Sequence, residues 1–301
     1  MKFKNNYKQK NKIKKKQNFY GNFSSGASFA GMDKIYFSNK NLNHIKKEIK
    51  KNIKKMNISK DELRDKIIMN VGSGRECLGF LQYRPKKIYH YDISQTNIQN
   101  FKKIIKKLNL KNLIISRQLD LSRNKLPKNK FDFIYLHGII QHVDFVNIGV
   151  KNLCTSLKKD GLMWFYFYRP GSLNIFLGSL QRFLVKKTSI KYFLKEVKKK
   201  HLNNFIDGIM DDVFVPNRQL FYPTNYNSFL KKNNCKIIGN TYLKNMTKKI
   251  DFCKFHASVV FFVKKKSGKK LNIQKDNSHL KRSFGANVLD SKLYKDKNIV
   301  K

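Results

Sequence analysis

The sequence has few cysteines and no long uninterrupted apolar run, and each of these features excludes a class of protein. Its 301 residues include four cysteines, which are widely spaced and form no CxxC pair. A disulfide framework or a zinc site is therefore not expected, and a reducing compartment such as the cytoplasm is the simpler setting. The most apolar stretch, residues 162–185, carries Arg169-Pro170 in its middle. A charge followed by a helix breaker argues against a membrane-spanning helix there.

Acidic residues are scarce, with 19 Asp and Glu against 65 Lys and Arg, a formal charge of +46. Such a balance by itself would indicate a nucleic acid or an anionic membrane as partner. Only nine of the basic residues are arginine, however, and proteins that read nucleic acids favour the planar fork of arginine. Lysine spread along a whole chain is typical of a solvated surface, and a coding bias toward Lys, Asn, Ile and Phe explains it equally well. The charge therefore favours a solvated surface over a dedicated polyanion site.

Both ends of the chain are polar and basic. Residues 1–38 contain eight lysines in the first twenty positions and no apolar segment after them, which is not the pattern of a signal peptide. We predict a disordered basic arm over residues 1–38 and a loose basic tail over residues 264–301. The domain itself is expected over residues 39–263, and it should open with a helix over residues 41–56.

From Lys66 onward, short apolar runs alternate with longer amphipathic ones. This alternation predicts an α/β fold with a doubly wound, mostly parallel sheet. An insertion over residues 170–222, with two helices, interrupts the pattern, and the last two strands should form an antiparallel hairpin because no helix-length span separates them. The predicted helices in the alternating part cover residues 94–110, 143–161 and 224–233. The seven predicted strands cover residues 66–71, 87–93, 112–120, 131–138, 161–168, 235–243 and 255–263.

The first predicted strand ends in the segment NVGSGRE, with Gly72 and Gly74 on either side of a serine. Both glycines can take positive φ and lack a Cβ, so that backbone N–H groups and the next helix N-terminus can approach a ligand. Asp92 ends the second strand, 18 residues beyond Gly74, where an acid typically binds ribose hydroxyls. The pair predicts a nucleoside-containing ligand at the carboxyl edge of the sheet. The alternative is a tight turn followed by an aspartate that caps the next helix.

Two common nucleotide motifs are absent, because GxxxxGK[ST] does not occur and GxGxxG fails after Gly74. At this point the chain resembles the class I S-adenosylmethionine-dependent methyltransferases. The segments that carry the resemblance are IIMNVGSGRE, YHYDIS, RQLDLS, FDFIYLHGIIQHVD and LCTSLKKDGLMWFYF, in that order, over residues 60–170. It implies a Rossmann-like methyltransferase fold, S-adenosylmethionine as cofactor and transferase activity.

The resemblance also implies roles for particular residues. Gly72, Ser73 and Gly74 would pass the methionine end of the cofactor, and the chain at His137 would hold its amino-acid part. Asp92, with Ile93, would bind the ribose hydroxyls, and Asp120, with Leu121, would lie at the adenine. The sequence departs from the family at Asn70, where an acid is usual, and at Glu76, where a third glycine is common. Asn70 can accept a hydrogen bond but offers no charge to an ammonium group.

Four side chains are candidates for contact with the acceptor. His142 is the first candidate for a general base or substrate contact, with His137 as the second, although a histidine that caps or packs on the following helix would look the same. Tyr168 and Arg169 end the fifth strand and are predicted to bind substrate; the alternative for Arg169 is an ion pair with Asp211 or Asp212. No metal site is expected, since the spacing of the two histidines is poor for one.

The absence of two motifs also limits which classes of methyl acceptor are expected. The sequence contains neither [ND]PP[YFW] after the fourth strand nor a Pro-Cys dipeptide, so methylation of DNA bases is disfavoured. A small-molecule acceptor beneath a lid formed by the insertion is the leading hypothesis. RNA methylation through the basic termini, and a catalytically silent relative that binds an adenosyl ligand, remain alternatives. A further one is peripheral membrane contact through residues 172–187, where ordinary lid packing would explain the same apolar stripe. The oligomeric state stays open.

Overall fold

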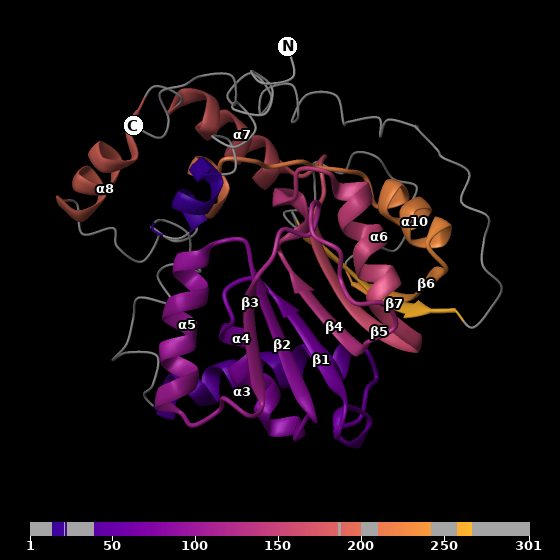
Figure 1. Ribbon diagram of the computed structural model, residues 1–301. Coiled ribbons are helices and arrows are strands. Elements are labelled where there is room, and N and C mark those ends of the chain that lie inside the picture. The colour runs from indigo at the N-terminus through magenta and orange to yellow at the C-terminus, as the bar shows by residue number, and fades with distance from the viewer. Residues whose placement is uncertain are drawn as a thin grey trace, which may run out of the picture.

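The computed structural model describes residues 14–20, 22, 39–185, 188–199, 210–241 and 258–266. They form one seven-stranded sheet in the order β3-β2-β1-β4-β5-β7-β6 (Figure 1). The seven strands are β1 (Ile67–Val71), β2 (Lys87–Asp92), β3 (Ile114–Gln118), β4 (Phe131–His137), β5 (Leu157–Tyr168), β6 (Cys235–Thr241) and β7 (Ser258–Lys265).

The first five strands pair in parallel, and β7 runs antiparallel to both of its neighbours, β5 and β6. The predicted doubly wound α/β fold is confirmed, and so is the antiparallel pairing of the last two strands. The chain order reverses between β1 and β4, which places a crevice at the carboxyl ends of these strands.

Helices cover both faces of the sheet because its strands are apolar on both faces (Figure 1). In β4, Phe133 and Tyr135 belong to one apolar cluster, while Ile134 and Leu136 belong to the other. The first cluster is closed by α3 (Asn39–Lys55), α4 (Arg75–Phe80) and α5 (Gln95–Lys107). The second is closed by α6 (Val146–Ser156) and α10 (Pro223–Lys232). Short 3-10 turns η1 (Asp61–Leu63), η2 (Leu81–Tyr83) and η3 (Ile140–His142) complete this part.

The predicted end of the helix over residues 143–161 was wrong by several residues. The helix was expected to run to residue 161, but α6 ends at Ser156 and β5 begins at Leu157. Leu157 is buried and pairs with Phe131, so sheet pairing takes the segment away from the helix. Asp160 has φ 61° next to a register shift in the β4–β5 pairing, so Asp160-Gly161 forms an irregularity inside a strand instead of a helix stop.

The N-terminal arm needs a correction as well, because residues 14–20 are helical and not disordered. Phe19 is fully buried in a third apolar cluster with Ile190 and Phe214. A single aromatic side chain in a lysine-rich segment gives no helical periodicity, so the sequence alone did not reveal this packing. Most of the predicted basic tail lies outside the described residues, and Lys264 and Lys265 still belong to β7.

The predicted insertion contains α7 (Leu173–Leu184), α8 (Ile190–Lys199) and the π-helical turn η5 (Met210–Phe214). Figure 1 shows α7 and α8 beyond the carboxyl end of the sheet, with the N-terminal helix beside them. In the part of the chain that the structure describes, no helix combines the length and the apolar character that crossing a membrane requires.

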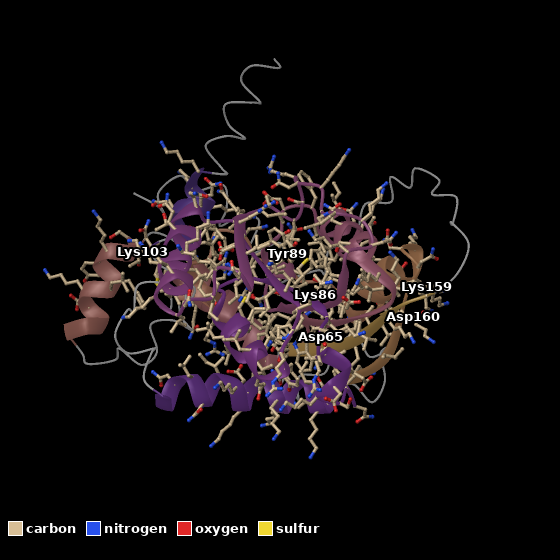
Figure 2. All side chains as sticks on the ribbon, turned by 60° about the horizontal axis from the view of Figure 1, so that its bottom comes forward. Asp65, Lys86, Tyr89, Lys103, Lys159 and Asp160 are labelled. Carbon is tan, nitrogen blue, oxygen red and sulfur yellow. The ribbon has the colours of Figure 1, made fainter. Side chains whose placement is uncertain are left out.

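The lysine side chains project from many different elements. Figure 2 shows Lys103 of α5, Lys86 before β2 and Lys159 in β5 at separate places on the surface, and all three are exposed. This scatter agrees with the interpretation of the bulk charge as a solvated surface.

Candidate active site

The loop after β1 takes a backbone shape that only glycine adopts freely. Gly72 has φ 124° and Gly74 has φ 85°, and Gly74 is the N-cap of α4. A Cβ on Gly74 would lie 3.0 Å from the ring of Phe101, and one on Gly72 would lie 3.0 Å from Ile139. The loop therefore needs both glycines, for conformation and for space.

A buried histidine holds this loop from behind. His90 Nε2 lies 2.7 Å from the carbonyl oxygen of Gly72, and its Nδ1 lies 2.8 Å from Ser116 Oγ. Because a carbonyl only accepts, the ring carries its proton on Nε2 and accepts from the serine at Nδ1. Burial lowers the pKa of His90 to about 4, so the ring is neutral at neutral pH. We did not predict this residue, although its place between Tyr89 and Tyr91 in β2 indicates an inward side chain.

Asp92 ends β2 with a buried carboxyl group. Its Oδ1 accepts from the Ser94 backbone N–H at 2.6 Å, and its Oδ2 accepts from Asn97 Nδ2 at 3.3 Å. Burial raises the pKa of Asp92 to about 7, and these two hydrogen bonds partly oppose the rise. A buried acid with this pKa gains from further donors to its ionised form, such as a pair of hydroxyls.

The loop after β3 places a second carboxylate at the same edge. Asp120 Oδ1 accepts from the backbone N–H and the hydroxyl of Ser122, at 2.8 and 2.7 Å. Arg123 lies 3.2 Å from Asp120 Oδ2 through Nε and 3.6 Å from Asp144 Oδ2 through Nη2. Asp120 is therefore held in place by its own loop and joined to the loop after β4.

These three strand ends meet in one cavity of about 70 Å³. The predicted site residues that line it are Gly72, Asp92, Ile93, Asp120, Leu121 and His142. The other lining residues are Lys16, Tyr20, Val71, Leu119, Ile139 and Val143. Asn70, Ser73, Gly74, His137, Tyr168 and Arg169 were also predicted as site residues and do not line this cavity.

Asn70 lies in β1, two residues before Gly72, and puts a neutral side chain where the resemblance leads us to expect an acid. It is fully buried, and its Oδ1 accepts from the Cys77 thiol at 3.4 Å. Its Nδ2 has no hydrogen-bond partner among the described residues. An unsatisfied buried donor beside the glycine loop, together with the carboxylates of Asp92 and Asp120, is compatible with a polar adenosyl ligand.

His142 lines the cavity, but its surroundings make it a weak base. Its Nδ1–H donates to the carbonyl of Asn217 at 2.8 Å, so that Nε2 keeps its lone pair and lies 3.3 Å from Gln141 Nε2. Burial, with further contributions from Lys16 and Arg218, lowers the pKa of His142 to about 3. In this arrangement the ring can accept a hydrogen bond from a ligand more readily than it can take a proton.

His137 lies in an aromatic stack instead. Its ring stacks on Tyr166 at 4.2 Å between centroids, and its Nδ1 accepts from Tyr135 Oη at 3.1 Å and from the Trp164 indole at 3.4 Å. The proton is therefore on Nε2, and burial lowers the pKa of His137 to about 4. Tyr168 is half-buried against Tyr166, and Arg169 is buried at 4% exposure.

The helix over residues 14–20 covers the cavity, which the sequence did not predict. Lys16 Nζ donates to the carbonyl of His142 at 2.7 Å and to Asp144 Oδ1 at 3.0 Å. The Tyr20 carbonyl accepts from Asn97 Nδ2 at 2.9 Å, beside Asp92. Asn217 of the insertion donates to the same two groups, the His142 carbonyl and Asp144 Oδ1, at 3.2 and 3.3 Å.

Comparison with known proteins agrees with this geometry. Residues 69–165, from β1 to β5, match the family model described as a methyltransferase domain. No curated protein matches the sequence.

Several solved structures are similar to this chain at low sequence identity. The [4+2]-cyclase SpnF has 9% identity and a TM-score of 0.50, with 74% of this chain and 81% of that chain covered. An S-adenosylmethionine-dependent methyltransferase from Aquifex aeolicus has 11% identity and a TM-score of 0.45, with 80% and 98% covered. The YcgJ protein from Bacillus subtilis has 13% identity and a TM-score of 0.45, with 75% and 100% covered. The match of the family model across the glycine loop and the five parallel strands therefore identifies residues 69–165 as a methyltransferase domain.

Proposed function

We propose that this methyltransferase moves the methyl group of S-adenosylmethionine to a small-molecule acceptor bound beneath the N-terminal helix. The observation that carries the proposal is the convergence of Gly72, Asp92 and Asp120 on one cavity that Lys16 and Tyr20 cover. A small acceptor can bind in a cavity that the side chains of Lys16 and Tyr20 cover. A nucleotide inside a folded RNA is too large to enter such a covered cavity.

The residues that would hold the cofactor are those of the three strand ends. The ionised carboxylate of Asp92 would accept from both ribose hydroxyls, and the loop of Asp120 would face the adenine. The backbone at Gly72 would pass the methionine part. Asn70 would offer an amide donor where an acid is usual in the family, so that the carboxylate of the cofactor gains a neutral partner and its ammonium loses a charged one.

When bound, the cofactor supplies an electrophilic methyl on a positively charged sulfur, which is already a strong leaving group. The protein then has to align the acceptor and keep water out, which is mostly positioning. Ile139, Leu121 and Val143 give the cavity apolar walls. His142 Nε2 would accept a hydrogen bond from the acceptor in place of the Gln141 amide, and its low pKa suits orientation better than proton removal.

Ligand entry would require the N-terminal helix to move. The cavity of about 70 Å³ is below the roughly 300–1,000 Å³ typical of small-molecule sites. Lys16 and Tyr20 are the lining residues that do not belong to the sheet or its loops, so their withdrawal would enlarge the cavity without disturbing the strands.

The proposal can be tested with labelled cofactor. The full-length chain is incubated with methyl-labelled S-adenosylmethionine and, in separate reactions, with a fraction of small metabolites and with total RNA. Label in a small molecule is expected, and label in RNA alone would overturn the proposal. Heat of cofactor binding without any transfer would instead support a catalytically silent relative. Asp92→Asn serves as the inactive control, and Asp65→Asn, at an exposed position with φ 56°, as the matched one.

A further inference from the structure

Helix α7 turns its polar side inward and its apolar side outward. Ile175, Ser179 and Arg182 are buried, at 5%, 1% and 5% exposure. Five of its large apolar side chains lie on the opposite side, where a helix that packs on a core would carry polar residues. This α7 face consists of Phe176, Leu177, Leu180, Phe183 and Leu184, which are between 41% and 70% exposed.

Specific polar contacts fix this orientation. Arg182 Nη1 donates to the carbonyls of Val213 and Val215, both at 2.9 Å. Arg218 Nη2 donates to Ser179 Oγ at 2.7 Å, and that hydroxyl donates to the carbonyl of Ile175 at 2.9 Å. A rotation of α7 that buried its leucines would break these bonds and would carry an arginine to the surface. These hydrogen bonds therefore hold the apolar side of α7 outward.

Exposed basic residues lie on the two helices next to α7. Lys191 and Lys195 of α8 are exposed, as is Tyr192 between them at 60%. Lys14 and Lys15 are exposed on the N-terminal helix. Both of these helices meet the end of α7 in the third apolar cluster, which joins Phe19, Ile190 and Val185. Figure 1 shows the three helices together beyond the carboxyl end of the sheet.

We propose that the α7 face rests on the surface of an anionic lipid bilayer, with these lysines at the level of the headgroups. A helix with an exposed apolar face and a lysine rim has the chemistry of an interfacial helix. A second copy of the chain fits less well, because each copy carries a formal charge of +46 and the two would repel. A nucleic acid offers its charge to the lysines but has no apolar surface for the leucines. An anionic bilayer offers apolar acyl chains to the α7 face and negative headgroups to the lysines.

The first experiment measures flotation of the full-length chain with lipid vesicles, without cofactor. Vesicles of phosphatidylcholine alone are compared with vesicles that also contain phosphatidylglycerol. We expect flotation with the anionic vesicles only. Leu180→Ser/Phe183→Ser should lower vesicle affinity at least about tenfold. Ile148→Ser/Ile238→Ser, which changes two apolar residues exposed elsewhere on α6 and β6, should leave it within about twofold. Absence of flotation, or an equal loss in both variants, would overturn the proposal.

A second pair of variants separates a local lysine rim from the charge of the whole chain. Lys191→Ala/Lys195→Ala should weaken binding to anionic vesicles several-fold more than Lys86→Ala/Lys103→Ala, which removes the same charge from the exposed positions in Figure 2. Equal losses would mean a diffuse attraction and would contradict the proposal. Light scattering of the chain without lipid tests a second copy as the occupant: a dimer that Leu180→Ser/Phe183→Ser dissociates would also overturn it. None of these measurements requires methyl transfer, so the result stands independently of the acceptor.

Discussion

Lys16 and Asp144 form an ion pair at 3.0 Å although their side chains are only 2% and 4% exposed. The lysine comes from the N-terminal helix and the aspartate from the loop after β4, so the pair joins the helix that covers the cavity to the loop that carries His142 and Val143. Asp144 also lies near Arg123, which contacts Asp120. A continuous series of charged groups therefore runs from the adenine side of the proposed site to the element that closes it.

Removal of Lys16 should release the cover. Lys16→Met leaves Asp144 buried with one cation fewer, and breaking a buried pair in this way costs about 3–5 kcal/mol. The cost should appear locally, as faster hydrogen exchange at residues 14–20, because this pair joins the helix to the loop after β4. Lys15→Met, at the exposed neighbouring position, is the control and should exchange like the parent chain. Unchanged protection of the helix in Lys16→Met would contradict this prediction.

Asp92 should dominate the affinity for the cofactor. Asp92→Asn removes the charge that would accept from two hydroxyls, and hydrogen bonds to a charged group contribute about 1.5–3 kcal/mol. Calorimetry with S-adenosylmethionine should show affinity lower by roughly one to two orders of magnitude, while the melting temperature stays level or rises because a buried carboxyl group is neutralised. If Asp92→Asn and Asp65→Asn bind S-adenosylmethionine with equal affinity, Asp92 does not contact the cofactor.

Cofactor binding should release protons near neutral pH. The pKa of Asp92 is raised to about 7, and the ribose hydroxyls would bind its ionised form, so binding lowers this pKa. Affinity should therefore fall by up to about tenfold per pH unit as the pH drops below 7. Calorimetry in two buffers with different ionisation enthalpies counts the released protons directly. Proton uptake, or no exchange at pH 6, would be the contrary result.

Stability should decline in acid because three histidines are buried in neutral form. The pKa values of His90, His137 and His142 are lowered to about 4, 4 and 3. Below pH 6.5 each of these histidines therefore takes up a proton when the chain unfolds. Asp92 acts in the opposite direction, since its raised pKa keeps a proton on the folded chain up to about pH 7.

The net uptake near pH 5 is about two protons, and each contributes about 1.4 kcal/mol per pH unit to the loss of stability as the pH falls. The free energy of unfolding measured between pH 6.5 and 4 should show this slope. His90→Gln should reduce it by about one proton, whereas His44→Gln, at an exposed position of α3, should not. A flat profile would show that these histidines are protonated in the folded chain.

The sheet and the glycine loop could be predicted because they depend on local signals. The alternation of apolar runs gave the strands, and Gly72, Gly74 and Asp92 marked strand ends that parallel pairing brings to one edge. The predicted ends of the helix over 143–161 failed because the burial of Leu157 against Phe131 depends on a partner 26 residues away.

The position of the N-terminal helix over the cavity could not be predicted, because only tertiary contacts reveal it. Lys16 is one of eight lysines in the first twenty residues, and only its contacts with His142 and Asp144 distinguish it from the others. The apolar stripe of α7 is readable from sequence, but its outward direction depends on Arg182 and Arg218.

The third apolar cluster also orders events during synthesis of the chain. Phe19 leaves the ribosome early, but its packing partners Val213, Phe214 and Val215 follow nearly two hundred residues later. The N-terminal helix therefore has no apolar surface to pack on until the insertion has been synthesised, while the strands that carry Gly72 and Asp92 can already pair. A nascent chain halted before Met210 therefore lacks the residues on which the N-terminal helix packs, and the cavity can be covered only after Val215 has been made.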